Sequence, residues 1–150
     1  MATRDVKDIL KQAAQQEEKA HKFYMDAIKL VKDATAKAWL KELAEEELKH
    51  KEMLQKFDVS KIKQFKSAEV HDLHITEYLV DKDVAAVKDF QDVLIVAMKK
   101  EQKAYHFYVG MAKSADSNDV KNLCKALAQE ELKHKHKLEL YYDDIVFKED

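Results

Sequence analysis

Apolar side chains recur every three or four residues along most of the chain, which is the period of an α-helix that buries one face. The spacing is clearest in two segments, from Trp39 to Phe57 and from Leu123 to Tyr141, which follow the same steps of three and four residues. The periodicity as a whole predicts helices over about 5–31, 35–57, 84–113 and 117–144.

Short polar side chains stand where these helices should begin. Asp33 or Thr35 is suited to cap the second helix and Ser117 the fourth. The two helices of each half are joined by few residues, so each pair must be antiparallel. Residues 58–83 lack a helical period and can travel the length of a bundle at about 3.3 Å per residue. We therefore expect an all-α four-helix bundle in which a long crossover joins two αα-hairpins.

The second half of the chain repeats the first. Residues 13–57 align without a gap on residues 97–141, and the strings ExKAxxFY and LAxEELKHK occur in both halves in register. The repeat predicts one domain over 1–150, with a first half at about 5–57, the crossover at 58–83 and a second half at about 84–144.

Composition supports the helical assignment and removes other classes of structure. Gly occurs once and Pro not at all, so a sandwich or barrel with many tight β-turns is excluded. The sequence is instead rich in Ala, Lys, Glu and Leu, which are good helix formers.

The charge and the cysteine content limit which partners and which cellular compartment fit the sequence. The net charge of −2 offers no basic field for nucleic acid or anionic lipid. The longest apolar run, 93–98, is too short to cross a bilayer, and the N-terminal residues do not form an apolar export signal. A single cysteine excludes a disulfide framework and a four-cysteine metal site. We expect a cytoplasmic protein that binds neither nucleic acid nor membrane.

Acidic and imidazole side chains interrupt the apolar faces at matching positions. Glu47 and His50 lie on the buried face of the second predicted helix, and Glu131 and His134 are their counterparts in the fourth. Residues three apart lie about 60° apart around a helix axis, so a Glu and a His at this spacing can reach one ion. The neighbouring Glu46 and Glu130 fall about 100° away, toward the rim.

The first and third predicted helices each add one acid and one tyrosine to the same interior. Glu17 and Tyr24 are seven residues apart on one face, and so are Glu101 and Tyr108. Glu18 is the weaker candidate, because it faces away and its repeat counterpart is Gln102.

Four carboxylates in one bundle centre would repel one another and would be costly to bury unpaired. Two divalent cations balance that charge, and carboxylate oxygen with imidazole nitrogen is a donor set for iron or manganese, and also for zinc. One Glu from each of two helices and a Glu-x-x-His from each of the other two is the donor set of di-iron and di-manganese carboxylate bundles. The sequence thus predicts a metal site with six ligands: Glu17, Glu47, His50, Glu101, Glu131 and His134.

The remaining candidates have more than one interpretation. Tyr24 and Tyr108 are either core residues whose hydroxyls bond to some carboxylate, or groups that orient the ligand glutamates. Cys124, whose repeat counterpart is Leu40, is expected to be a small buried apolar residue. The other histidines are expected at the surface or in the crossover, without a metal role: His21, His71, His74, His106 and His136.

The two repeated strings resemble those of the rubrerythrin-like branch of the ferritin-like superfamily. The resemblance covers nearly the whole chain and includes the DLHITEYLV segment of the crossover. It implies a ferritin-like four-helix bundle and a di-iron centre held by the six residues above, with carboxylate bridges from Glu47 and Glu131. It also implies redox chemistry with peroxide or dioxygen, and a homodimer.

Two departures from that family pattern bear on the activity. Rubrerythrins carry a four-cysteine rubredoxin module that feeds electrons to the iron, and this sequence does not contain those cysteines. They also carry a further glutamate one turn beyond the third-helix ligand, where this chain has Ala104, matched by Ala20 in the first half. Turnover would then need an external electron donor, such as a separate rubredoxin, and a redox-linked exchange of ligands is not expected.

Three functions remain open from the sequence. The first is a di-iron oxidoreductase that reduces hydrogen peroxide or uses dioxygen. The second is a ferroxidase that oxidises ferrous iron, or an iron-binding storage protein. The third is a metal-free helical interaction module, in which replacing Glu47 and Glu131 by alanine would raise stability because it relieves repulsion.

Overall fold

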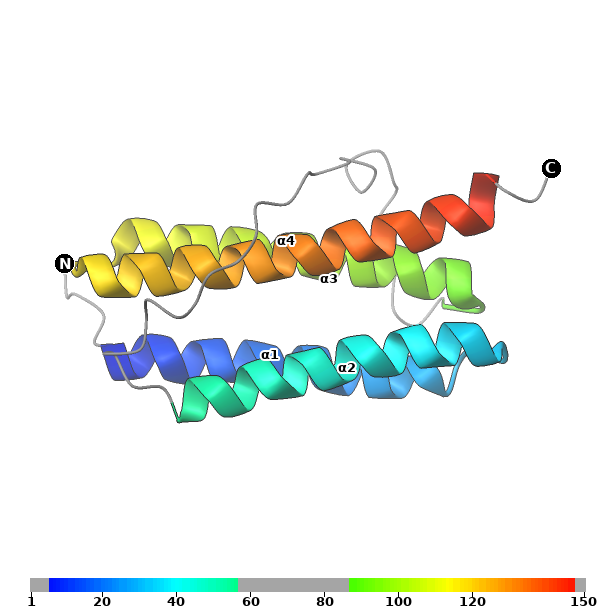
Figure 1. Ribbon diagram of the computed structural model, residues 1–150, viewed down its shortest axis with the longest axis horizontal. Helices are drawn as coiled ribbons and strands as arrows, with labels where there is room; N and C mark the ends of the chain where they lie inside the picture. Colours follow the sequence, from blue (N-terminus) through cyan, green and yellow to red (C-terminus); the bar gives the residue numbers. More distant parts are fainter. Residues whose placement is uncertain (1–5, 57–86, 148–150) are drawn as a thin grey trace.

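A computed structural model describes residues 6–56 and 87–147 of the chain. They form four helices, α1 (Val6–Ile28), α2 (Ala34–Gln55), α3 (Phe90–Ser114) and α4 (Asn118–Phe147) (Figure 1). The described ranges contain no strand. The predicted all-α bundle is confirmed.

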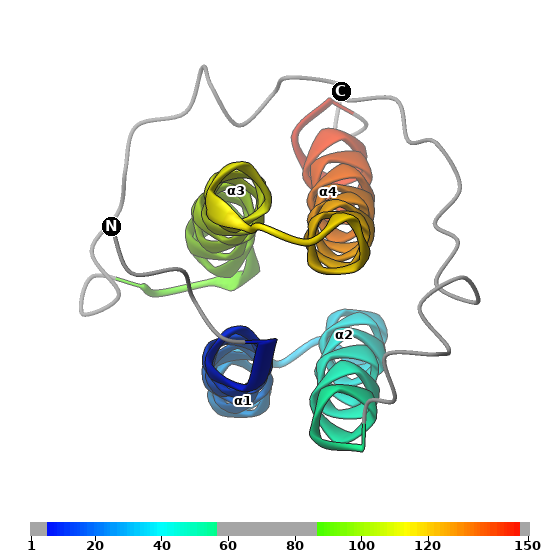
Figure 2. The same cartoon turned by 90° about the vertical axis from the view of Figure 1, so that its left-hand side faces the viewer.

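The helices form two antiparallel hairpins that lie face to face. Seen along the bundle, α3 lies beside α1 and α4 beside α2 (Figure 2). α2 ends at the opposite end of the bundle from the start of α3, as a lengthwise crossover requires (Figure 1). The predicted crossover itself, at 58–83, lies outside the described residues.

Two of the predicted helix starts are capped as expected. The Asp33 carboxylate accepts a hydrogen bond from the backbone N–H of Ala36 at 3.0 Å, so Asp33 caps α2 rather than Thr35. The Ser117 hydroxyl accepts one from the N–H of Val120 at 3.1 Å at the start of α4. Each bond satisfies one of the N–H groups that the first turn of a helix leaves without a partner.

Other helix ends differ from the prediction. α1 ends at Ile28 rather than near residue 31, and a turn follows it. α3 begins at Phe90 rather than near residue 84, because Asp89 caps it by accepting from the N–H of Asp92 at 2.9 Å. Apolar residues upstream of residue 90 made the predicted helix begin too early.

The apolar core is divided into two clusters. One contains Ile9, Leu54 and Leu127, and the other contains Leu43 and Leu94, all almost completely buried. At the end of the second cluster, Trp39 is only half-buried and stacks on Tyr141 with ring centres 3.9 Å apart. The predicted acidic and imidazole residues lie between the two clusters along the chain.

None of the described helices is both long enough and apolar enough to span a membrane.

The two candidate caps of α2 give a matched pair of substitutions. We expect Asp33→Ala to lower the free energy of unfolding by about 1 kcal/mol, because the N–H of Ala36 loses its acceptor. Thr35→Ala, two residues away, should change it by less than about 0.5 kcal/mol. Urea denaturation of both variants measures the difference, and equal losses would contradict the assignment of Asp33 as the cap.

Candidate metal centre

Each helix contributes one buried glutamate to the middle of the bundle. Glu17 of α1, Glu47 of α2, Glu101 of α3 and Glu131 of α4 are all at most 2% exposed. They are inside because each occupies the apolar face of its helix, one or two turns from buried leucine or alanine. The structure thus brings together the four acids that the sequence placed on the inward faces.

The two predicted histidines lie in the same layer. The imidazole of His134 is 1% exposed and that of His50 13% exposed, and the rings stack with centres 5.6 Å apart. Nδ1 of His50 lies 3.6 Å from Glu17, and Nδ1 of His134 lies directly against Glu47. Each Nδ1 therefore faces the carboxylates.

These side chains form two overlapping groups of donor atoms. Within each group one atom from every residue lies within 4.8 Å of the others. The groups are Glu17, Glu47, His50 and Glu131, and Glu47, Glu101, Glu131 and His134. The two glutamates that occur in both groups are Glu47 and Glu131, on the two helices that also carry the histidines.

Many of the converging atoms are buried without a hydrogen bond among the described residues. They include one oxygen of Glu17, one of Glu101, both of Glu47, and Nδ1 of both histidines. Buried polar atoms normally have partners, and leaving one without costs about 1–3 kcal/mol. Lone pairs that converge in this way fit a metal ion, which carboxylate oxygen and imidazole nitrogen would coordinate.

The tyrosines cross between the first and third helices. The hydroxyl of Tyr24 on α1 donates to Glu101 on α3 at 2.6 Å, and that of Tyr108 on α3 donates to Glu17 on α1 at 3.2 Å. Burial raises the pKa of both phenols well above 10, and the nearby carboxylates raise it further. The hydroxyls therefore stay protonated and can only donate to these glutamates.

Burial acts unequally on the four carboxyl groups of the metal-free protein. It raises the pKa of Glu47 and Glu131 well above 4.5, and the neighbouring carboxylates add to the effect. Burial acts in the same direction on Glu17, but the close approach of Glu47 and His50 lowers its pKa to about 2. Without a metal, the shared pair thus holds protons that a cation would displace.

Two further glutamates, Glu46 and Glu130, stand behind the histidines. Nε2 of His134 lies 2.7 Å from Glu46 of α2, and Nε2 of His50 lies 3.6 Å from Glu130 of α4. A carboxylate on the second nitrogen fixes which imidazole nitrogen is free to bind a metal. The sequence placed both glutamates at the rim and gave them no role. The two residues are repeat counterparts and both are glutamate, and this match was the sequence signal for a role.

The two outer contacts are not equivalent. Glu46 also accepts a hydrogen bond from Lys137 at 3.3 Å, and the repeat counterpart of Lys137 is Met53. The contact with His134 lowers the pKa of Glu46 to about 2, against the effect of burial. His134 is thus held more firmly than His50.

The other residues considered in the sequence lie away from the centre. Glu18 is 62% exposed and pairs with Lys51 at 3.3 Å. Nδ1 of His21 lies 2.8 Å from the Ala44 carbonyl oxygen. His106 is exposed, His136 half-buried, and Cys124 completely buried, which confirms the expectation for the cysteine. His71 and His74 lie outside the described residues.

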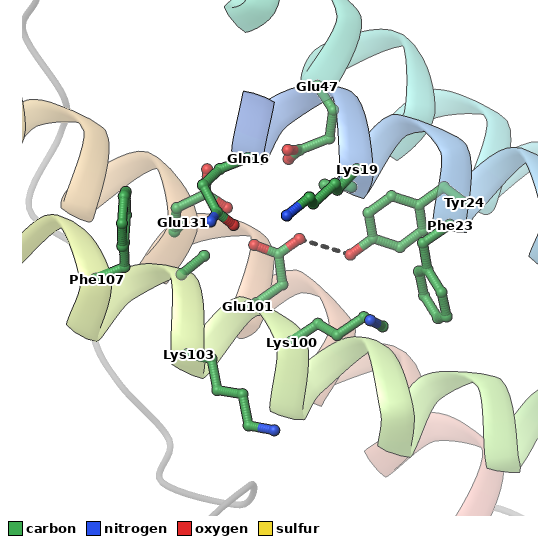
Figure 3. A pocket seen from close by; sticks show the side chains of 12 residues that line it. Gln16, Lys19, Phe23, Tyr24, Glu47, Lys100, Glu101, Lys103, Phe107 and Glu131 are labelled. Atoms are coloured by element: carbon green, nitrogen blue, oxygen red, sulfur yellow. Dashed lines mark hydrogen bonds between the residues drawn. The ribbon is translucent and has the colours of Figure 1, made fainter. Parts of the chain in front are cut away.

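A cavity of about 360 Å³ between α1 and α3 reaches the centre. Glu47, Glu101 and Glu131 point toward one another at its inner end, beside Tyr24 (Figure 3). Its other lining residues come from the two flanking helices: Gln16, Lys19, Ala20, Phe23, Lys100, Lys103, Ala104 and Phe107. The two alanines that mark the departure from the family pattern therefore leave open space beside the carboxylates.

The metal-free protein should lose stability as pH rises. Burial alone would lower the pKa of His50, but contacts with Glu130 and Glu17 raise it from 6.5 to about 9. Its contribution is fully present below pH 6.5 and is lost as pH rises through about 9. Deprotonation of Glu47 and Glu131 acts in the same direction. Thermal melts of chelator-treated protein should show a lower Tm at pH 9 than at pH 6.5, and an unchanged or higher Tm would contradict this account.

Neutralising the outer carboxylates should weaken metal binding. We expect Glu46→Gln to lower affinity about 10-fold to 100-fold, because His134 loses the charge that orients it. Glu130→Gln should have a smaller effect, since its contact with His50 is longer. Glu45→Gln, on the exposed side of α2, is the matched control. Competition with a chromophoric chelator measures all three, and equal affinities of Glu46→Gln and the control would refute the positioning role.

The rubrerythrin family profile matches residues 8–142. Neither the search of curated proteins nor that of solved structures gave a significant match. The matched range includes all four helices nearly complete, and with the cluster of carboxylates and histidines it supports a di-iron protein in general. The chain belongs to the rubrerythrin family, a ferritin-like family.

Proposed function

We propose that the protein is a di-iron oxidoreductase that reduces hydrogen peroxide, or uses dioxygen, with electrons from an external donor. The observation that carries the proposal is a cavity that opens on a buried cluster of four glutamates and two histidines. The cluster would hold two iron ions per chain, with manganese or zinc as substitutes. The proposed ligands are Glu17, Glu47, His50, Glu101, Glu131 and His134.

The two overlapping donor groups suggest how the ligands are shared. Glu47 and Glu131 belong to both groups and would help to hold both ions, while Glu17 with His50, and Glu101 with His134, would each help to hold one. Two iron ions held by these residues would supply two electrons together to an O–O bond. The chain's own contribution is to keep the donors in place and to keep bulk water from them.

Tyr24 and Tyr108 act as positioning residues in this proposal. Each donates its hydroxyl hydrogen to one oxygen of a glutamate, Glu101 or Glu17, and leaves the other oxygen for a metal. Because burial keeps both phenols protonated, the tyrosines hold the direction of these carboxylates across a change of metal charge.

The charge of the cavity favours an oxidant over ferrous iron as the substrate that enters there. Lys19, Lys100 and Lys103 line it, and the acids that line it are the three proposed ligands at its inner end. A positive mouth repels an incoming cation, whereas peroxide and dioxygen are uncharged. Ferroxidation for iron storage is therefore the second candidate.

The source of electrons and the assembly also belong to the proposal. The sequence does not contain the four cysteines of a rubredoxin module, so a separate donor protein such as a rubredoxin would supply the electrons. We further propose a cytoplasmic homodimer.

The reaction is tested by mixing the anaerobic diferrous protein with peroxide or dioxygen in a stopped-flow spectrometer. We expect peroxide to oxidise both irons faster than dioxygen does, and repeated turnover when a reductant is supplied. Oxidation of many added ferrous ions per chain, with retention of the product in a large assembly, would support storage instead. Failure of both oxidants to react would contradict the proposal.

Two adjacent glutamates separate the di-iron proposal from a metal-free module. We expect Glu17→Ala to lose about one of two bound irons, because Glu17 is 1% exposed and lies in a donor group. Glu18→Ala should keep both, since Glu18 is 62% exposed. Iron analysis of both variants gives the result. Equal iron contents, with Glu17→Ala more stable than the native protein, would favour the metal-free module.

A further inference from the structure

The tyrosine contacts differ between the two halves of the centre. Tyr24 donates to Glu101 at 2.6 Å, whereas the repeat-related bond from Tyr108 to Glu17 measures 3.2 Å. The hydroxyl of Tyr108 also lies 3.4 Å from the carbonyl oxygen of Ala13, and its single hydrogen cannot serve both acceptors fully. A hydroxyl bonded to a carboxylate usually lies about 2.5–2.7 Å from it, so Glu101 is held by the stronger bond.

The contacts behind the histidines differ in the same sense. Nε2 of His134 lies 2.7 Å from Glu46, within the usual hydrogen-bond range of about 2.7–3.2 Å. Nε2 of His50 lies 3.6 Å from Glu130, beyond that range. The ring of His134 is 1% exposed, against 13% for that of His50. Both kinds of support are therefore closer on the side of the centre that Glu101 and His134 complete.

Lys137 breaks the symmetry of the repeat on this side. Its Nζ lies 3.0 Å from Glu42 and 3.3 Å from Glu46, which are one turn apart on α2. Burial alone would lower the pKa of Lys137, but the bond to Glu42 raises it above its usual value, so the ammonium group stays charged. Its repeat counterpart is Met53, which has no charge. The carboxylate behind His134 therefore has an anchor that position 53 of the first half cannot supply.

Each donor group defines one metal position, which we name after its histidine: the His134 position, with Glu101, and the His50 position, with Glu17. A ligand that is already held in its binding direction gives a metal ion more affinity than one that must be ordered when the ion binds. The two shared glutamates serve either position. The first ion should therefore bind where the other two ligands are better oriented, which is the His134 position.

We propose that Lys137 is a positioning residue of the metal centre, which holds Glu46 against His134 so that the His134 position takes the first ion and releases it last. The His50 position takes the second ion and exchanges it with the solution. The inference rests on the proposed function, because it takes the two-metal centre as given. It adds a stable one-ion form of the protein, in which the second ion can be replaced without loss of the first.

Cobalt(II) is a suitable probe, because it binds imidazole and carboxylate and can be located by anomalous X-ray scattering. Repulsion between two ions would separate the two binding steps even in a symmetric centre, so the decisive observation is which position fills first. In crystals grown with one cobalt ion per chain, we expect the His134 position to be at least about fivefold more occupied than the His50 position. Equal occupancy, or a peak mainly at the His50 position, would overturn the inference.

Substitutions of Lys137 separate its positioning role from a role in stability. Lys137→Met introduces the side chain of the repeat counterpart, and we expect it to bring the occupancy ratio below about twofold and to weaken the first step in calorimetry about threefold to tenfold. Lys137→Arg keeps a positive charge beside Glu46 and should restore the native ratio. Lys133→Met removes a charge from the exposed side of α4, one turn away, and is the matched control. A Lys137→Met protein with the same ratio as this control would contradict the positioning role.

The repeat also offers the reverse change. Met53→Lys introduces an ammonium group on the side of His50, at the place that corresponds to Lys137, and Glu130 corresponds to Glu46. We expect this variant to strengthen the second step in calorimetry about threefold and to raise the share of the first cobalt ion at the His50 position. An unchanged second step and an unchanged share would count against the inference.

The same preparations keep this inference apart from the proposed function. Stepwise cobalt binding that depends on Lys137, in a protein whose diferrous form reacts with neither peroxide nor dioxygen, contradicts the proposed reaction and supports the inference. A diferrous protein that reacts with peroxide, while the first cobalt ion divides equally between the two positions, supports the proposed reaction and contradicts the inference.

Discussion

The confinement of four carboxylates and two imidazoles between two apolar clusters is the constraint on which the rest of the bundle depends. Glu47 is completely buried and Glu17, Glu101 and Glu131 nearly so, and a layer of like charges in such surroundings would oppose folding. In the metal-free protein that repulsion is relieved by protonation, since burial raises the pKa of Glu47 and Glu131. Cations would relieve it more completely, because they also satisfy the oxygen and nitrogen atoms that lack hydrogen bonds.

The internal repeat explains why each supporting contact occurs twice and crosses between the halves of the chain. Tyr24 and Tyr108 each reach the glutamate of the opposite half, and the carboxylates behind His50 and His134 also come from the opposite half. The hairpins are thus joined through the centre itself. The same symmetry gives the centre two different sides, with lysines along the α1–α3 cavity and carboxylates behind the histidines between α2 and α4. The electrostatic field on the α1–α3 side would therefore differ from that on the α2–α4 side, for an oxidant or a cation that approaches the centre.

Periodicity predicted the helices and identified the acids that are buried. A Glu or His within an apolar face must point into the same interior as the apolar residues around it. It did not predict the start of α3, since the cap formed by Asp89 is a local hydrogen bond and leaves no trace in the apolar pattern. It also missed the contacts of Glu46 and Glu130 with the histidines, which depend on how α2 and α4 face each other. The match of Lys19 with Lys103 carried little weight in a lysine-rich chain until both were found to line one cavity.

Anomalous X-ray scattering at the iron edge, from crystals of protein loaded with ferrous iron, tests the central claim most directly. The account predicts two iron peaks per chain, one among Glu17, Glu47, His50 and Glu131 and the other among Glu47, Glu101, Glu131 and His134. Iron peaks only at the surface, or a loaded protein whose buried carboxylates and histidines surround no ion, would contradict it.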